Sequence, residues 1–198
     1  ISGFVAMRML SLSMGDVGLK AGNLLVQAAI ALPGVAFGIA EYVILRPRPL
    51  IQELSFEALW LPALILLLAT GFSEEFIFRG VLQHVFREQM GRQGVILVAA
   101  IFAVLHIGHL SFWDVVFVFV VALYFAWATI KTGSILGVTL SHGITNILLF
   151  LVLPFLWQAP AREATMPPTL VEAAPAVTIS APLPSASATA IVTLDQGN

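Results

Sequence analysis

Long apolar stretches alternate with short polar segments along most of the chain. The apolar stretches cover residues 22–45, 56–71, 95–108, 112–131 and 134–157. A helix rises about 1.5 Å per residue, so about 20 apolar residues can cross the roughly 30 Å hydrocarbon core of a bilayer. The pattern therefore predicts an all-α fold, a polytopic bundle of about five transmembrane helices.

The two ends of the chain depart from this pattern. Residues 1–21 mix apolar residues with Ser, Gly and Arg, which indicates an N-terminal interfacial segment or the remnant of a helix. Residues 158–198 are rich in Ala, Pro, Ser and Thr, a composition typical of a disordered tail. Residues 22–157 form the expected transmembrane core. Because the chain begins at Ile1 rather than at Met, we expect further spans to precede it in a longer protein.

Composition narrows the classes of function. Of the 198 residues, 59% are hydrophobic and 10% are charged, whereas soluble domains contain about 25% charged residues. The formal net charge of -2 offers no basic surface for a nucleic acid. The absence of cysteine excludes disulfides, a thiol nucleophile and a Cys-type zinc site. The expected partner at this level is the lipid bilayer.

Three charged residues, Glu74, Glu75 and Arg79, interrupt a strongly apolar region. Charges in such surroundings are rare unless they are paired or used. Glu75 and Arg79 have the i,i+4 spacing, acid first, that favours a helical ion pair. Glu74 points about 100° away around the helix. We therefore predict a supporting Glu75–Arg79 pair and a free, reactive Glu74, with Ser73 as the N-cap of a helix covering about 74–90.

A hinge near Gly71 would divide residues 56–90 into two segments and place all the basic loops on one side of the membrane. These loops contain Arg46, Arg48, Arg87, Arg92 and Lys131. The excess of Lys and Arg in cytoplasmic loops would make that side cytoplasmic. We expect this hinged arrangement, in a multi-pass protein of the cell membrane, because one long helix would separate the arginines of the first loop from the others.

Polar residues also occur inside two later apolar stretches. His106 lies in the third stretch, and His142 and Asn146 lie at i,i+4 in the fifth. Both histidines fall near the middle of the membrane, so their side chains can meet. Glu74 needs a tilted helix or an irregular hinge to join them. Any one of these polar side chains could serve packing alone. Because burying each of them in a membrane costs free energy, their occurrence together indicates a shared site.

Three other ionisable residues receive structural interpretations. Glu41 is predicted to be an interfacial acid beside the basic loop that follows it. His84 falls on the polar half of its helix and is expected to be solvated. His109 ends the third stretch, where an interfacial role is expected, although His106 and His109 also have the i,i+3 spacing of a metal pair.

A carboxylate, two imidazoles and an amide inside a membrane bundle suit hydrolysis. A carboxylate with one histidine can activate a water molecule, and a second histidine with the asparagine can donate hydrogen bonds to the developing oxyanion. This scheme needs no cofactor. The main alternative is a zinc site built from His106, His142 and Glu74.

Three motifs occur in order on successive helices. They are Glu-Glu-x-x-x-Arg at 74–79, Phe-x-x-x-His at 102–106 and His-x-x-x-Asn at 142–146. In this combination the chain resembles the CPBP family, the CAAX-protease and bacteriocin-processing membrane proteins, also called the Abi family. The family includes the type II CAAX prenyl endopeptidases. The resemblance covers about residues 70–150.

The resemblance implies an intramembrane endopeptidase with a membrane-associated protein or peptide substrate. Glu74 and His106 would activate water, His142 and Asn146 would hold the oxyanion, and the Glu-Arg pair would support them. A metal-dependent version has also been considered for the family. Some members cleave near the C-terminus of prenylated proteins, and bacterial members are linked to peptide maturation or bacteriocin self-immunity.

Two further classes of function compete with the protease. The first is a non-catalytic membrane protein of bacteriocin-immunity or scaffold type, in which the polar residues serve binding or packing. The second is a transporter or proton relay, because intramembrane Glu and His also act there. No inverted repeat of the kind found in many transporters is visible in the sequence. Of the three classes of function, the motifs favour the protease.

Overall fold

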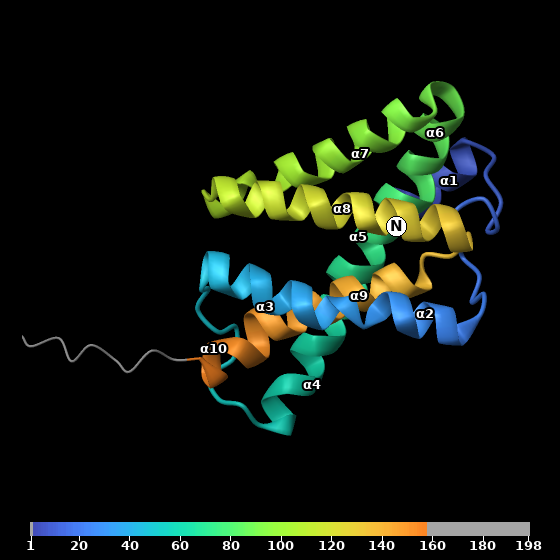
Figure 1. The fold of residues 1–198 in the computed structure, drawn as a ribbon. Coiled ribbons are helices and arrows are strands. Elements are labelled where there is room, and N and C mark those ends of the chain that lie inside the picture. Colours follow the sequence, from blue (N-terminus) through green and yellow to red (C-terminus); the bar gives the residue numbers. More distant parts are fainter. Residues whose placement is uncertain (1, 158–198) are drawn as a thin grey trace, which may run out of the picture. The chain divides into compact units, whose positions relative to one another are not determined.

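The computed structural model describes residues 2–157, and within that range the chain is helical with no strand (Figure 1). In chain order the elements are α1 (Ser2–Met9), α2 (Leu24–Ala31), α3 (Pro33–Leu45), α4 (Phe56–Ile65), η1 (Leu66–Phe72), α5 (Ser73–Glu75), η2 (Phe76–Leu82), α6 (Gln83–Met90), α7 (Arg92–Val104), η3 (Leu105–His109), α8 (Phe112–Thr132), α9 (Leu136–Ile147), η4 (Leu148–Val152) and α10 (Leu153–Leu156). The predicted tail at 158–198 lies outside the described residues.

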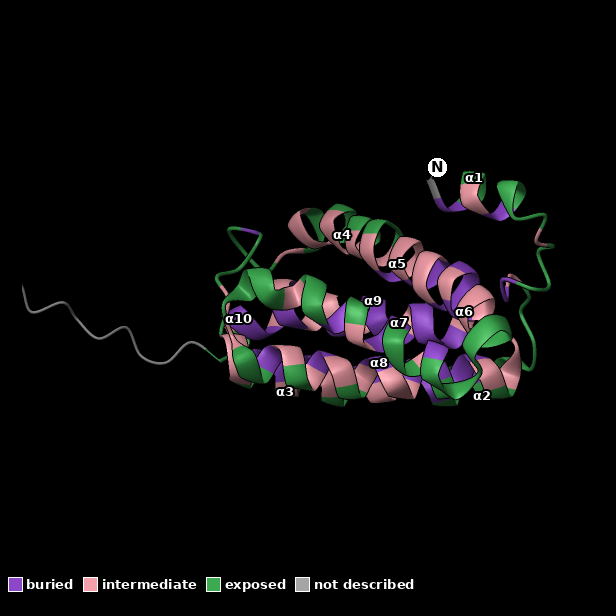
Figure 2. Cartoon of the chain, turned by 90° about the horizontal axis from the view of Figure 1, so that it is seen from above, coloured by how far each residue is buried: buried purple, intermediate pink, exposed green. Residues whose placement is uncertain are grey.

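Several of these elements join end to end, so that the described residues contain five helices long and apolar enough to cross a membrane. They cover Leu24–Leu45, Phe56–Met90, Arg92–His109, Phe112–Thr132 and Leu136–Leu156. This confirms the predicted all-α transmembrane bundle. Large apolar side chains on the outer faces are exposed, and α4 has no buried residue (Figure 2). Such a surface suits lipid, where apolar side chains need no cover.

Helix α9 is central because it packs against η1 on one side and against α2 and α3 on the other. Glycines permit these close approaches, as small residues do between membrane helices. A Cβ added to Gly71 would lie 3.1 Å from the backbone nitrogen of Gly143 in α9. A Cβ on Gly34 of α3 would overlap the backbone carbonyl of Ser141 in α9. The two glycine contacts therefore fix α9 against both neighbours.

The predicted hinge near Gly71 is wrong, because Phe56–Met90 is one continuous helix of 35 residues. Gly71 is buried at the contact with α9 and serves close packing instead of a bend. The predicted N-cap is also wrong. Ser73 has helical φ and ψ of -64° and -40°, and its hydroxyl donates to the carbonyl of Leu68 at 3.0 Å.

The continuous helix also changes the predicted grouping of the basic loops. Arg46 and Arg48 precede its first residue, whereas Arg87 and Arg92 lie at its far end. Lys131, in the last turn of α8, lies at that far end as well (Figure 1). The five basic residues are therefore not on one side of the bundle. The correction follows from the unbroken helix that separates the first two from the others.

The segment from residue 2 to residue 21 contacts the bundle. The ring of Phe4 in α1 lies 4.5 Å from that of Phe76 in η2, and Met7 and Val17 are buried in the same apolar cluster. In the loop after α1, the hydroxyl and backbone N–H of Ser13 both donate to the carboxylate of Asp16. These hydrogen bonds hold the pKa of Asp16 below its usual value.

Candidate functional site

The predicted carboxylates lie on an irregular part of the long helix. Ser73–Glu75 forms a single α-helical turn between two π-helical segments, Leu66–Phe72 and Phe76–Leu82. Wider π turns are uncommon and often occur at functional sites. Here they place adjacent glutamates in different environments opposite α9.

Glu75 is fully buried and connects two other polar side chains. Its Oε1 atom accepts a hydrogen bond from Nη1 of Arg79 at 3.1 Å, which confirms the predicted i,i+4 ion pair. The same oxygen lies 2.9 Å from Nδ1 of His142 on α9. The guanidinium of Arg79 also lies over the ring of Phe102, 4.1 Å from its centroid. Arg79 therefore holds Glu75, and Glu75 orients the His142 ring through Nδ1.

Glu74 is more open, with 35% of its side chain exposed. Its Oε2 atom lies 4.0 Å from Nε2 of His142. No hydrogen bond to Glu74 is found among residues 2–157. At a distance of 4.0 Å the two atoms can share one bridging water molecule, which donates a hydrogen bond to Oε2 of Glu74.

His106 comes from η3, the short 3-10 segment that ends the third span. Its Nδ1 atom lies 3.0 Å from the backbone carbonyl of Phe102. Because a carbonyl oxygen can only accept, this contact assigns the proton to Nδ1 and leaves Nε2 of the neutral ring as an acceptor. The ring of Phe102 separates the two histidines, with centroids 4.9 Å from His106 and 6.1 Å from His142.

Asn146 lies one turn beyond His142 on α9. Its Nδ2 atom donates to the hydroxyl of Thr70 at 2.8 Å, and that hydroxyl donates to the carbonyl of Leu66. The contact fixes the plane of the amide and uses one of its two N–H groups. The second N–H group remains available to another acceptor.

A small cavity collects residues from four helices. It has a volume of about 30 Å³, and its polar lining consists of Glu41, His106, His142, Thr145 and Asn146. The predicted histidines and asparagine therefore do share one space, as the depth argument required. Glu74 meets His142 from outside this cavity and has no contact with His106 among the described residues.

The prediction that Glu41 is an interfacial acid beside the basic loop is wrong. Only 6% of it is exposed, and it faces the cavity instead of the basic loop. The reason is its position on α3, which packs along both α8 and α9. The sequence contained one signal of this position. Glu41 stands four residues before the end of the apolar stretch at Leu45, so it belongs to the span and not to the loop that follows.

Asp114 is a second buried carboxylate that the sequence analysis did not select. It is 0% exposed, and one of its oxygens lies 3.2 Å from Nδ1 of His109. His109 in turn lies against His106, with ring centroids 6.1 Å apart. The Asp114–His109 pair therefore anchors the short segment that carries His106. By contrast, His84 pairs with the exposed Glu88 at 3.3 Å, away from this group.

Among residues 2–157 no group of three or more His, Asp or Glu side chains is close enough to hold a metal ion. His106, His142 and Glu74, the set considered for zinc, do not converge, because Glu74 and His106 lie on different sides of His142.

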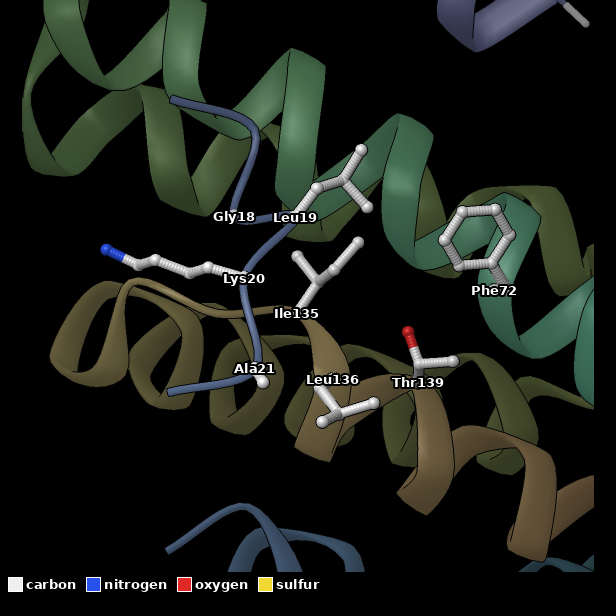
Figure 3. Close-up of a pocket in the computed structure, with 8 residues that line it drawn as sticks. All are labelled: Gly18, Leu19, Lys20, Ala21, Phe72, Ile135, Leu136 and Thr139. Carbon is white, nitrogen blue, oxygen red and sulfur yellow. The ribbon is translucent and has the colours of Figure 1, made fainter. Parts of the chain in front are cut away.

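A larger, apolar cavity of about 300 Å³ lies between residues 18–21, the long helix and α9. Figure 3 shows Phe72 of the long helix facing Thr139 of α9, while the side chain of Lys20 extends away from them. Phe72 precedes Glu74 by two residues, and Thr139 lies one turn before His142.

The fold and these contacts define a multi-pass membrane protein with a buried glutamate–histidine site. Residues 56–148, which include all six predicted site residues, match the family model described as type II CAAX prenyl endopeptidase, Rce1-like. The match covers just under half of the chain, and it agrees with the family that the three motifs suggest. Searches of curated proteins and of solved structures found no match.

Proposed function

We propose that the protein is an intramembrane endopeptidase that hydrolyses peptide bonds of membrane-associated proteins or peptides. The observation that supports this most is the array on His142, with Glu75 at 2.9 Å from Nδ1 and Glu74 at 4.0 Å from Nε2. A buried carboxylate on one nitrogen fixes the orientation of the ring, as a hydrogen-bond donor to a developing charge requires. The other nitrogen is directed at the free carboxylate.

Glu74 and His106 are proposed to take part in activating water from different sides of His142. The carboxylate of Glu74 is not held by another side chain among the described residues, and Nε2 of His106 is an acceptor. Water gives up a proton as its oxygen bonds to the carbonyl carbon of the substrate. That proton passes to the leaving nitrogen when the C–N bond breaks.

His142 and Asn146 take the role of holding the oxyanion. Nδ1 of His142 donates to Glu75, so the ring donates from Nε2 to the oxyanion in its doubly protonated form. The second N–H of Asn146 is the other donor, and Thr70 keeps that amide in place. Donors fixed before the reaction stabilise a developing charge without reorganisation. The proposed mechanism uses no metal ion.

The larger, apolar cavity is proposed to hold an apolar side chain or attached chain of the substrate. Its lining is almost wholly hydrocarbon, and it opens between the long helix, α9 and residues 18–21. A substrate that enters from the bilayer would bring such a group with it. We place the protein in the cell membrane. The end with Arg87, Arg92 and Lys131 is proposed to be cytoplasmic, because it has more basic residues than the end with Arg46 and Arg48.

The test is cleavage of a panel of membrane-anchored peptides by the protein in vesicles. Glu74→Gln should lower the rate by about 10²–10⁴-fold, the usual contribution of a general base. Glu57→Gln is the matched control, since Glu57 is an exposed glutamate on the same long helix. A strong chelator should leave the wild-type rate unchanged.

Each other outcome has a clear meaning. Equal cleavage by the wild type and Glu74→Gln would refute the catalytic assignment. Loss of cleavage with the chelator would require a metal that the present geometry does not gather. Tight peptide binding without cleavage by any variant would favour a non-catalytic scaffold or immunity protein, and ion flux that depends on Glu74 would favour a transporter.

A further inference from the structure

The Glu41 side chain contributes to the polar lining of the small cavity, yet it lies outside the segment that the family model matches. It comes from α3, whereas His106, His142 and Asn146 come from η3 and α9. Apolar walls from Phe102, Val118 and Phe125, among others, surround these polar groups.

The Glu41 carboxylate has no hydrogen bond or ion pair among residues 2–157, although only 6% of the residue is exposed. The basic residues that follow it, Arg46 and Arg48, are exposed. A buried carboxylate without a partner is costly, so such groups are normally hydrogen-bonded to protein or to ordered water. The partner of Glu41 must therefore come from within the cavity.

The size of the cavity selects that partner. One water molecule needs on the order of 10–15 Å³ and two to four polar contacts. The cavity of about 30 Å³ has room for one or two water molecules and too little for a side chain or a lipid group. Its polar groups also match a water molecule. Glu41 and Nε2 of His106 can accept hydrogen bonds from it, and the second N–H of Asn146 can donate a hydrogen bond to it.

We propose that Glu41 is a positioning residue that holds a water molecule inside the membrane bundle, beside His106, as the supply for hydrolysis. The role of this water in hydrolysis rests on the proposed function, whereas the existence of the water site does not depend on it. Water is scarce among apolar helices, so a hydrolase of this kind needs a polar group that retains it. Glu41 supplies that group from a helix that carries none of the proposed catalytic residues.

Hydroxyl-radical footprinting of the whole protein in lipid nanodiscs tests the water site directly. Radicals generated by a brief X-ray pulse label side chains that contact bound water. In the wild type, Phe102 and Phe117 of the cavity wall should be labelled faster than Phe76, which is buried in a separate apolar cluster. Equal labelling of the three rings would overturn the proposal without any variant.

Two substitutions of Glu41 then identify the group that holds the water. Glu41→Leu should reduce labelling of Phe102 and Phe117 to the level of Phe76, because an apolar side chain fills the polar end of the cavity. Glu41→Gln keeps the volume and a hydrogen-bonding group, so it should keep most of the labelling. Fast labelling in a folded Glu41→Leu protein would show that Glu41 does not hold the water.

Kinetics separate a supply role from mere packing. Glu41→Leu should lower kcat by about 10–100-fold, the effect of a misplaced reactant, with KM unchanged. Glu41→Gln should restore most of kcat. If the labelling changes as expected but kcat does not, the water is structural and the supply role is wrong. If no variant or wild type cleaves any substrate, the proposed function fails while the footprint still decides the water site.

Discussion

Glu74 and Glu75 are adjacent and chemically identical, yet their surroundings predict opposite consequences of the same substitution. Glu75 is 0% exposed and shares one oxygen with Arg79 and His142. Glu74 is partly exposed and has no hydrogen bond among the described residues. Glu75→Gln should therefore destabilise the fold, whereas Glu74→Gln should abolish cleavage and leave the fold intact.

The expected size follows from the geometry of the ion pair. At 3.1 Å and an effective dielectric constant of about 20, two unit charges attract by about 5 kcal/mol. Removing one partner of a buried pair typically costs about 3–5 kcal/mol, because the other charge is left uncompensated. Arg79 would be that charge, since it is only 3% exposed. For Glu74→Gln the free energy of unfolding should change by no more than about 0.5 kcal/mol.

The assay is equilibrium unfolding in mixed micelles titrated with SDS, followed by cleavage with the same samples. Arg79→Met should cost about as much as Glu75→Gln, and the double variant should cost clearly less than the two single losses combined. Additive losses, or equal stability of Glu74→Gln and Glu75→Gln, would refute the assignment of Glu75 to support and Glu74 to chemistry.

Three further substitutions test other contacts. Gly34→Ala should lower the free energy of unfolding by about 1–3 kcal/mol, because its Cβ overlaps the backbone of α9, whereas Gly108→Ala, with open space around it, should have no effect in the same SDS titration. Asp114→Asn should lower kcat about tenfold or more by loosening the segment that carries the reactive histidine, and a normal unfolding curve with unchanged kcat would contradict this. Thr70→Val should reduce kcat, with KM unchanged, by freeing the amide of Asn146; unchanged kcat would remove the amide from the mechanism.

The sequence predicted the five spans and the Glu75–Arg79 pair because both depend on local periodicity. Apolar length defines a span, and i,i+4 spacing defines a helical ion pair. The contact of Glu75 with His142 joins residues 67 positions apart, so no local pattern contains it. Two π-helical segments on the long helix also alter which side chains face α9, and these segments have no reliable sequence signal.

The errors about Gly71 and Glu41 have a common cause. Gly71 suggested a bend because glycine is flexible, but its lack of a side chain is used for contact with α9. Glu41 suggested an interfacial acid because basic residues follow it in sequence, but packing of α3 turns it toward the bundle. In both cases the role depends on the opposing helix, which the local sequence does not describe.

The length of the Phe56–Met90 helix has a consequence for how the protein fits its membrane. At 1.5 Å per residue it is about 52 Å long, and even a tilt of about 40° would leave it some 40 Å tall against a hydrocarbon core of roughly 30 Å. Ser73, beside the two glutamates, is its midpoint. The helix can therefore tilt about its centre as bilayer thickness varies, while Glu74 and Glu75 stay at nearly constant depth.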